Sequence, residues 1–78
     1  MNPLIRSIVD RINTATYEGT TLSFTDVESD EDNPDEYEID LRIVLVGDNI
    51  LVAIDGVLLI ADEDLVVRYI LRNCNGGL

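Results

Sequence analysis

Residues 41–60 read LRIVLVGDNILVAIDGVLLI, and this stretch decides the fold of the protein. It contains three aliphatic runs, Leu41 to Val46, Ile50 to Ile54 and Val57 to Ile60, which are separated by Gly47-Asp48-Asn49 and by Asp55-Gly56. An Asp-Gly pair between aliphatic runs favours a type I′ turn, because both central residues of that turn need positive φ. Such a two-residue turn places Ile54 opposite Val57. The stretch therefore predicts a three-stranded antiparallel meander.

The composition predicts one small folded domain over residues 1–78. Ile, Leu and Val supply 27 of the 78 residues, which is far more than an acidic disordered chain contains, although the net charge is −11. That charge disfavours direct binding to nucleic acid or to an anionic membrane, since both depend on Lys and Arg. We therefore expect a basic protein partner.

The residue types exclude several kinds of catalytic and metal site. Histidine is absent and Cys74 is the single cysteine, so one chain cannot form a disulfide, a Ser-His or Cys-His pair, or a thiolate zinc site. No glycine-rich phosphate loop occurs, and an EF-hand register fails whether it starts at Asp26 or at Asp30. We expect no enzyme activity, no cofactor and no specific metal site, and weak divalent-ion binding stays open. The first residues lack signal-peptide character, so we expect a soluble, cytoplasmic protein.

Two helices are expected, one near each end of the sequence. Asn2 can cap a helix that starts at Pro3 and runs to about Asn13, and its aliphatic residues recur with helical spacing. The second helix is expected from Asp62 to about Cys74, with acidic residues in its first turn and arginines further along, as the helix dipole favours.

The strands before the meander complete the predicted sheet. Thr20 to Val27 is rich in β-branched residues and is expected to be an edge strand, whereas Thr14 to Gly19 is expected to be a loop or irregular strand. Residues 36–46 alternate cleanly, with the core face formed by Tyr37, Ile39, Leu41, Ile43 and Leu45. Extending this alternation through the two turns places further residues on the same core face, namely Ile50, Val52, Ile54, Val57 and Leu59. We predict an α+β fold in the order α-β-β-β-β-α. Its four-stranded antiparallel sheet consists of the edge strand and the meander, and both helices cover one face.

The segment between residues 26 and 40 is strongly acidic. It contains nine carboxylates and no basic residue, and Asn33-Pro34 predicts a turn in its middle, as in the crest of a long hairpin. Carboxylates crowded on a strand repel each other, so their concentration favours capture of a basic surface. Two alternative explanations of the acidic charge stay open: the segment can be a solvated loop that keeps the protein in solution, or the charge can reflect adaptation to high salt. The predicted partner-binding residues are Asp26, Glu28, Asp30, Glu31, Asp32, Asp35, Glu36, Glu38 and Asp40.

The sheet face opposite the helices is also expected to carry an apolar patch. The alternation through the two turns places Val44, Leu51, Leu58 and Ile60 on that face, where the two helices of this chain cannot reach. Monomers rarely leave such a patch exposed. These four residues are therefore a candidate oligomer interface, and a homodimer is one expected outcome.

The order of elements and a few local segments resemble the small acidic phage-encoded anti-CRISPR inhibitors of RNA-guided nucleases. The likeness lies in Met1-Asn2 with Leu4-Ile5-Arg6 and Ile8, and in Glu63-Asp64 followed by Leu65-Val66, Tyr69-Ile70 and Asn75-Gly76. The resemblance implies a DNA mimic that binds in the groove where a nuclease reads DNA, but it transfers no site residue to this chain. The long acidic segment and the more apolar final helix depart from that family.

The expected function is thus that of a non-enzymatic inhibitor of the anti-CRISPR or anti-restriction type, which mimics nucleic acid in the basic groove of its target. The alternative is a structural or assembly module that oligomerises through the apolar sheet face, with the acidic segment only keeping the protein in solution.

Overall fold

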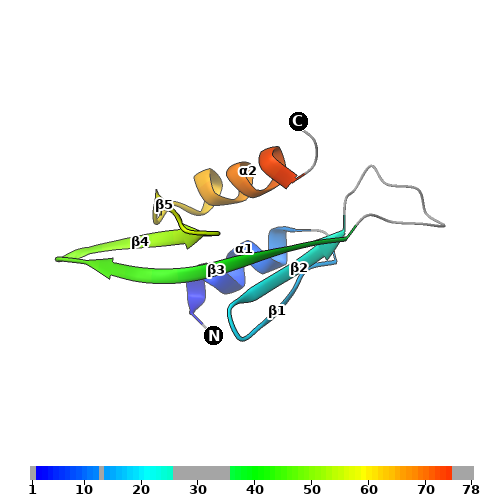
Figure 1. The fold of residues 1–78 in the computed structure, drawn as a ribbon, viewed down its shortest axis with the longest axis horizontal. Helices are drawn as coiled ribbons and strands as arrows, with labels where there is room; N and C mark the ends of the chain where they lie inside the picture. The colour runs from blue at the N-terminus through cyan, green and yellow to red at the C-terminus, as the bar shows by residue number, and fades with distance from the viewer. Residues whose placement is uncertain (1, 13, 26–35, 75–78) are drawn as a thin grey trace.

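The computed structural model describes residues 2–12, 14–25 and 36–74, and it contains two helices and one antiparallel sheet (Figure 1). The elements follow the chain as α1 (Pro3–Arg11), β1 (Thr16–Glu18), β2 (Thr21–Thr25), β3 (Glu36–Val46), β4 (Asn49–Ile54), β5 (Val57–Ile60) and α2 (Glu63–Cys74). The strands lie in the sheet in their chain order, β1-β2-β3-β4-β5. The predicted α+β class is confirmed.

Helix α1 begins as predicted and ends earlier than predicted. The side-chain Oδ1 of Asn2 accepts hydrogen bonds from the backbone N–H of Leu4 (2.8 Å) and of Ile5 (3.4 Å), which caps the helix at Pro3. The helix ends at Arg11, because Ile12 is already extended, with φ −105° and ψ 131°. The side chain of Ile12 is still buried, so the apolar pattern continues past the end of the helix.

Helix α2 begins one residue after the predicted start. Asp62 precedes the helix, and its Oδ1 accepts a hydrogen bond of 3.0 Å from the backbone N–H of Leu65. Val66, Val67 and Ile70 are buried, whereas Leu65 is 37% exposed. The helix therefore has one buried stripe and one aliphatic residue outside it.

The sheet has five strands, so the prediction of four strands was wrong. Thr16–Glu18 forms β1, which pairs with β2 across the Gly19-Thr20 turn and places Tyr17 opposite Leu22. The strand predicted from Thr20 to Val27 is described as Thr21–Thr25, and it lies between β1 and β3 rather than at the edge. A strand of three residues is too short to show an alternating pattern, and pairing with a neighbour is what makes it regular.

The two turns of the meander explain its register. Asp55 and Gly56 have φ values of 49° and 87°, as the predicted type I′ turn requires, and Ile54 pairs with Val57. Gly47 has φ 63° at the first position of the other turn, which glycine tolerates without strain. That turn contains two residues rather than the predicted three, because Asn49 pairs with Val46 as the first residue of β4.

Strand β3 belongs to two hairpins in succession. Residues 36–40 pair with β2, and residues 41–46 pair with β4 on the opposite edge of the strand. The two pairings meet without overlap at Asp40 and Leu41. The sheet is therefore long, and its β3–β4 end extends beyond both helices (Figure 1).

Hydrogen bonds join the two halves of the sheet at this point. Leu41 N–H donates to the carbonyl oxygen of Thr20 (2.8 Å), which ends the β2 pairing. Asp55 N–H donates to the carbonyl oxygen of Asp40 (3.0 Å), and Asp40 N–H donates to Oδ1 of Asp55 (2.8 Å), which begins the β4 pairing. We call these three bonds the strand junction.

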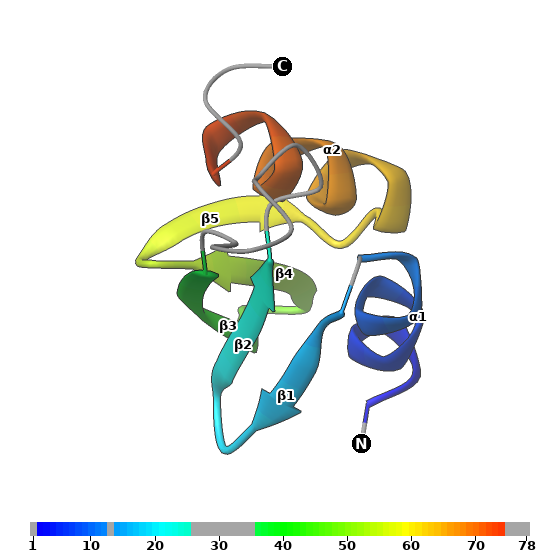
Figure 2. The ribbon, with the colours of Figure 1, turned by 90° about the vertical axis from the view of Figure 1, so that its right-hand side faces the viewer.

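Both helices cover the same face of the sheet, as predicted. Seen end-on, the sheet curves around the side on which α1 and α2 lie (Figure 2). The predicted face residues Ile39, Leu41, Val52 and Ile54 are buried there against the two helices. The core is completed by residues of the helices and of β2, namely Ile5, Ile8, Ile12, Leu22, Phe24, Val66, Val67 and Ile70.

The prediction placed the right residues on the core side of the sheet, but it assigned more of them to the buried core than the helices cover. Leu45, Ile50 and Val57 lie on the same side of the sheet as Leu41, but they are 73%, 56% and 45% exposed. The helices are too short to reach Leu45 and Ile50 at the far end of the β3–β4 hairpin, so the alternating pattern continues into solvent there. Val57 lies at the other end of β4, beside Ile54 on the edge strand β5.

Two substitutions of the same type on β3 distinguish the covered part of this face from the uncovered part. Leu41→Ala removes a fully buried side chain and should lower the free energy of unfolding by about 2–5 kcal/mol, because it leaves a cavity. Leu45→Ala should change it by no more than about 0.5 kcal/mol, because Leu45 is exposed. Urea unfolding followed by circular dichroism measures both, and similar losses for the two variants would contradict the described packing.

The strand junction predicts different effects for two substitutions at Asp55. Asp55→Asn keeps an oxygen that can accept from Asp40 N–H and tolerates positive φ, so stability should be nearly unchanged. Asp55→Gly also tolerates positive φ but lacks the acceptor, and it should cost about 1 kcal/mol in urea unfolding. Equal stability of the two variants would show that the side-chain bond contributes nothing.

Candidate protein-binding surface

The face of the sheet away from the helices is the candidate functional surface. Its polar half is built from β1, β2 and the first half of β3, whose register aligns residues in rows across the strands. One row contains Thr16, Ser23 and Glu38, and the next contains Glu18, Thr21 and Asp40. Each row therefore ends in a carboxylate beside hydroxyl groups.

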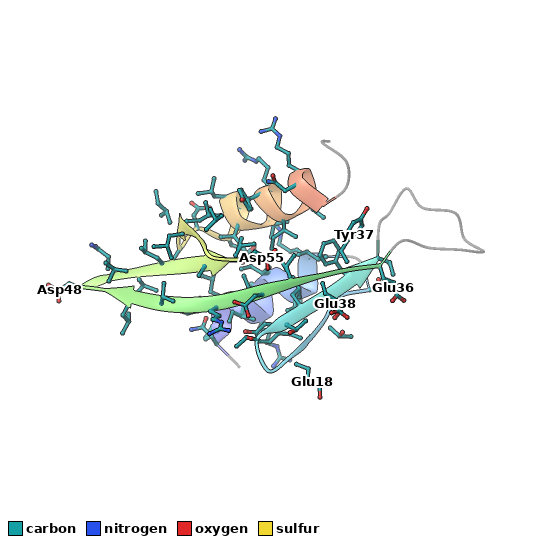
Figure 3. All side chains as sticks on the ribbon, viewed as in Figure 1. Glu18, Glu36, Tyr37, Glu38, Asp48 and Asp55 are labelled. Atoms are coloured by element: carbon teal, nitrogen blue, oxygen red, sulfur yellow. The ribbon has the colours of Figure 1, made fainter. Side chains whose placement is uncertain are left out.

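Three glutamates of this half-face are exposed to solvent. Glu36 and Glu38 lie two residues apart on β3 and so share a face, which is the predicted arrangement. Figure 3 shows both of them on the side of β3 away from α2, whereas Tyr37 points to the other side. Glu18 on β1 is exposed and belongs to the same face. We call Glu18, Glu36 and Glu38 the acidic face.

The remaining predicted residues of the acidic segment lie outside the described residues. These are Asp26, Glu28, Asp30, Glu31, Asp32 and Asp35, together with the predicted turn at Asn33-Pro34. Glu36 and Asp35 are neighbours in the chain, so this segment leads directly into the acidic face.

Asp40 was predicted to be a partner-binding residue, but its side chain is mainly engaged in hydrogen bonds within the fold. Its side chain is only 35% exposed and accepts hydrogen bonds from Nε of Arg42 (2.7 Å) and from Oγ1 of Thr20 (2.7 Å). These bonds, first that from Arg42 and then that from Thr20, lower the pKa of Asp40 below the ordinary value of an aspartate. Arg42 thereby offsets the charge of Asp40, which leaves the acidic face to the three glutamates.

Tyr17 fixes β1 against the strand junction. Its hydroxyl donates a hydrogen bond of 2.6 Å to the carbonyl oxygen of Leu41, and its ring packs against the core. Partial burial raises the pKa of the Tyr17 phenol, and the nearby Asp40 carboxylate raises it further. The phenol therefore stays protonated and keeps its donor role.

A hollow of about 240 Å³ lies beside the acidic face. Its lining is mainly hydroxyl and carboxylate side chains, and it also includes Phe24 and Tyr37, whose side chains lie on the helix-covered face of the sheet. The polar residues are Thr14, Thr16, Ser23, Thr25, Glu36 and Glu38. The hydroxyl and carboxylate groups suit the cationic head of a Lys or Arg side chain.

The arginines lie mostly on the helices, away from the acidic face. In α1, Arg6 and Arg11 outnumber Asp10, and Arg11 forms ion pairs with Glu63 (2.8 Å) and with Asp64 at the start of α2. Arg42 is the only basic residue described on the strands. The helical side is thus close to neutral while the acidic face stays negative.

The other half of the same sheet face is apolar, as predicted. Val44, Leu51 and Ile60 form one row across β3, β4 and β5, and Leu58 lies in the next row. Ile60 and Leu58 are 69% and 52% exposed, whereas Val44 and Leu51 are half-buried. The patch is therefore concentrated on β5 and is narrower than predicted.

Ala53 lies on this face and is nevertheless buried. Its cross-strand neighbours are Arg42 and Leu58, whose longer side chains flank its single methyl group.

The described residues contain no candidate metal site. Among residues 2–12, 14–25 and 36–74, no group of three His, Cys, Asp or Glu side chains is placed to hold a metal ion. In the same ranges, no helix is long and apolar enough to cross a membrane.

The sequence analysis missed Glu18 and the hydroxyl rows. Thr16-Tyr17-Glu18 is too short for alternation to identify it as a strand, so the usable signal was Gly19 directly after it. Gly19 lies three residues before Leu22 and is consistent with a hairpin turn between two strands, and that pairing is what brings Glu18 to the acidic face.

Comparisons with known proteins identify no relative: no protein-family model, curated protein or solved structure matches this chain.

The charge on Asp40 should depend on Arg42. Because its folded-state pKa is depressed, Asp40 stabilises the fold above the ordinary carboxyl pKa of about 3.9, and this contribution is lost as the pH falls through the lower folded-state value. In Arg42→Gln the pKa of Asp40 should rise toward the ordinary value, while Arg68→Gln on α2 should leave it unchanged. Carboxyl NMR titration measures this, and a pKa unaffected by Arg42→Gln would contradict the described bond.

Proposed function

We propose that this protein is a non-enzymatic inhibitor that binds the basic nucleic-acid-binding groove of another protein as an acidic mimic, in the manner of anti-CRISPR or anti-restriction proteins. The observation that carries the proposal is the segregation of charge. Glu18, Glu36 and Glu38 are exposed on a face without a helix, while the arginines lie on the helices or beside Asp40.

An open sheet face of this kind suits a protein surface better than it suits a small molecule. Glu36 and Glu38 are about 7 Å apart along β3. Glu18 lies in the row of Asp40, so it is about 10 Å across the sheet and about 7 Å along it from Glu38, which is about 12 Å in all. One DNA strand carries a charge per about 3.4 Å of axis, so these three residues alone are sparser than DNA. The six carboxylates of residues 26–35 adjoin Glu36 in the sequence and would raise the charge of the binding surface.

The surroundings of the acidic face support recognition of Lys and Arg. Each glutamate has hydroxyl-bearing neighbours in its row or in the adjacent hollow, and these can orient a bound guanidinium or ammonium group. Such contacts would guide association and weaken as salt screens the charges.

A second candidate function is that of an assembly module, which is favoured by the exposed aliphatic residues Leu58 and Ile60. The two functions use different parts of the molecule, so one protein can carry out both.

The test is a binding experiment with a matched charge control. The protein is immobilised on a support and incubated with a nuclease-treated bacterial lysate. Added duplex DNA is expected to displace a target that has bound to it. For that target, Glu18→Gln/Glu36→Gln/Glu38→Gln should slow association about tenfold or more at low salt. Asp40 is left unchanged because it belongs to the strand junction.

The control variant, Asp10→Asn/Asp48→Asn/Asp64→Asn, removes the same number of charges at exposed positions elsewhere. It should slow association much less than the acidic-face variant. Equal slowing by both variants would show that only net charge matters. A target that DNA does not displace would contradict mimicry.

A further inference from the structure

The hollow of about 240 Å³ is lined by two neighbouring rows of the polar half-face, and each row ends in a glutamate of β3. In one row, strand pairing sets Ser23 of β2 between Thr16 of β1 and Glu38 of β3. Serine has the smallest side chain of the six polar residues that line the hollow. The middle strand is therefore the floor of the hollow, and the longer side chains on either side of it are the walls.

The second row is held in place by hydrogen bonds. Thr25 pairs with Glu36 on one side, and on the other side its N–H donates to Oγ1 of Thr14 (3.2 Å). The hydroxyl groups of the two threonines are also hydrogen-bonded to each other. Thr14 has φ 54°, a left-handed conformation that a β-branched residue adopts only where the surrounding structure imposes it. This wall of the hollow is thus fixed before any ligand binds.

The two glutamates of the hollow are not neutralised within the described part of the chain. There, Glu36 and Glu38 form no ion pair and the Ser23 hydroxyl forms no hydrogen bond, whereas Asp40 is paired with Arg42. Both glutamates lie on the side of β3 away from α2 (Figure 3). They are about 7 Å apart along the strand, inside a Debye length of about 8 Å, so their charges repel each other. A cation bound between them would remove that repulsion.

The size of the hollow favours the end of one long side chain as its occupant. About 10–15 Å³ is enough for a single water, and pockets for drug-sized molecules measure about 300–1,000 Å³. At about 240 Å³ the hollow lies between these limits. It is too large for a bare ion and small for a cofactor.

The donor geometry favours arginine over lysine. A guanidinium has five N–H donors in one plane and can bond two carboxylates at once, whereas an ammonium is a compact charge with three donors. A guanidinium is also more weakly hydrated, so it loses less when it leaves water. Placed over Ser23, it can donate to Glu36, to Glu38 and to the serine hydroxyl.

We propose that the hollow is the anchor site for one arginine side chain of the basic protein partner, with Glu36 and Glu38 binding its guanidinium over Ser23. This inference rests on the proposed function and names the contact that holds the complex together after charge has guided association. Arginines seated in pockets are typical of the few residues that dominate the binding energy of an interface. Glu18 does not line the hollow, so its role is long-range attraction.

A free arginine derivative tests the hollow without a partner. The isotope-labelled protein is titrated with N-acetyl-arginine methylamide, whose guanidinium is its only charge, and amide shifts are followed by NMR. Saturable shifts at Ser23 and Thr25 are expected with a Kd of roughly 1–10 mM, as suits one side chain. The citrulline derivative, which has the same shape and no charge, should not bind. The lysine derivative should bind at least about threefold more weakly.

Matched substitutions show where the derivative binds. Ser23→Ile fills the floor of the hollow without changing the charge, and it should raise the Kd at least about tenfold. Ser7→Ile makes the same change at another half-buried serine, on α1, and should leave the Kd unchanged. Glu38→Gln keeps the size of the side chain and removes one charge, and it should also raise the Kd about tenfold. Circular dichroism should show that all three variants fold.

For a partner captured as described above, the anchor and the mimicry affect different rate constants. Ser23→Ile should speed dissociation at least about tenfold, because the anchor is lost. It should change association little, because the net charge is unchanged. The variant that removes all three charges of the acidic face should instead slow association.

Several results would overturn the anchor site. These are the absence of saturable binding, undiminished binding in Ser23→Ile, and equal binding of the citrulline derivative. A Kd of about 10 μM or lower for the free derivative would also overturn it, because such affinity indicates a site for a free small molecule. Failure of the proposed function gives a different result: the captured partner resists displacement by DNA, although the derivative still binds in the hollow.

Discussion

The strand junction at Asp40 and Leu41 is the constraint on which the rest of the structure depends. There, β3 ends its pairing with β2 and begins its pairing with β4, so one strand has to satisfy two neighbours in succession. The backbone of Thr20 ends the first ladder, and the side chain of Asp55 replaces a missing backbone acceptor at the start of the second. The Tyr17 hydroxyl then ties β1 to the same point. Without these bonds the two hairpins would be joined only by the backbone of β3 and by the core that they share under the helices.

This offset pairing explains why one sheet face carries two kinds of chemistry. The half of β3 that pairs with β2 brings Glu36 and Glu38 beside hydroxyl-rich strands, and the half that pairs with β4 brings Val44 beside Leu51 and Ile60. If β3 were paired with both β2 and β4 along its whole length, acidic and apolar residues would lie side by side on this face. The offset separates charge from apolar surface, and that separation is the basis of both candidate functions.

The separation also has an energetic consequence. Carboxylates crowded on one face repel each other, and their number is tolerated because the core of the protein does not depend on them. The buried aliphatic residues of α1, α2 and the inner sheet face supply the stability, while Arg42 offsets the one carboxylate that has a structural role. An acidic surface can therefore be presented by a small domain without loss of its fold.

Local patterns in the sequence determined much of this structure. The alternation along residues 36–46, the Asp55-Gly56 turn and the Asn2 cap depend on neighbouring residues, so they were predictable, as was the side of the sheet on which the helices lie. Tertiary structure alone decided the pairing of β1, the structural use of Asp40 and the exposure of Leu45. Each of these depends on how far a distant element reaches or on which strand lies alongside. A side-chain pattern shows which residues share a face of the sheet, but only the three-dimensional packing determines how much of that face the helices cover.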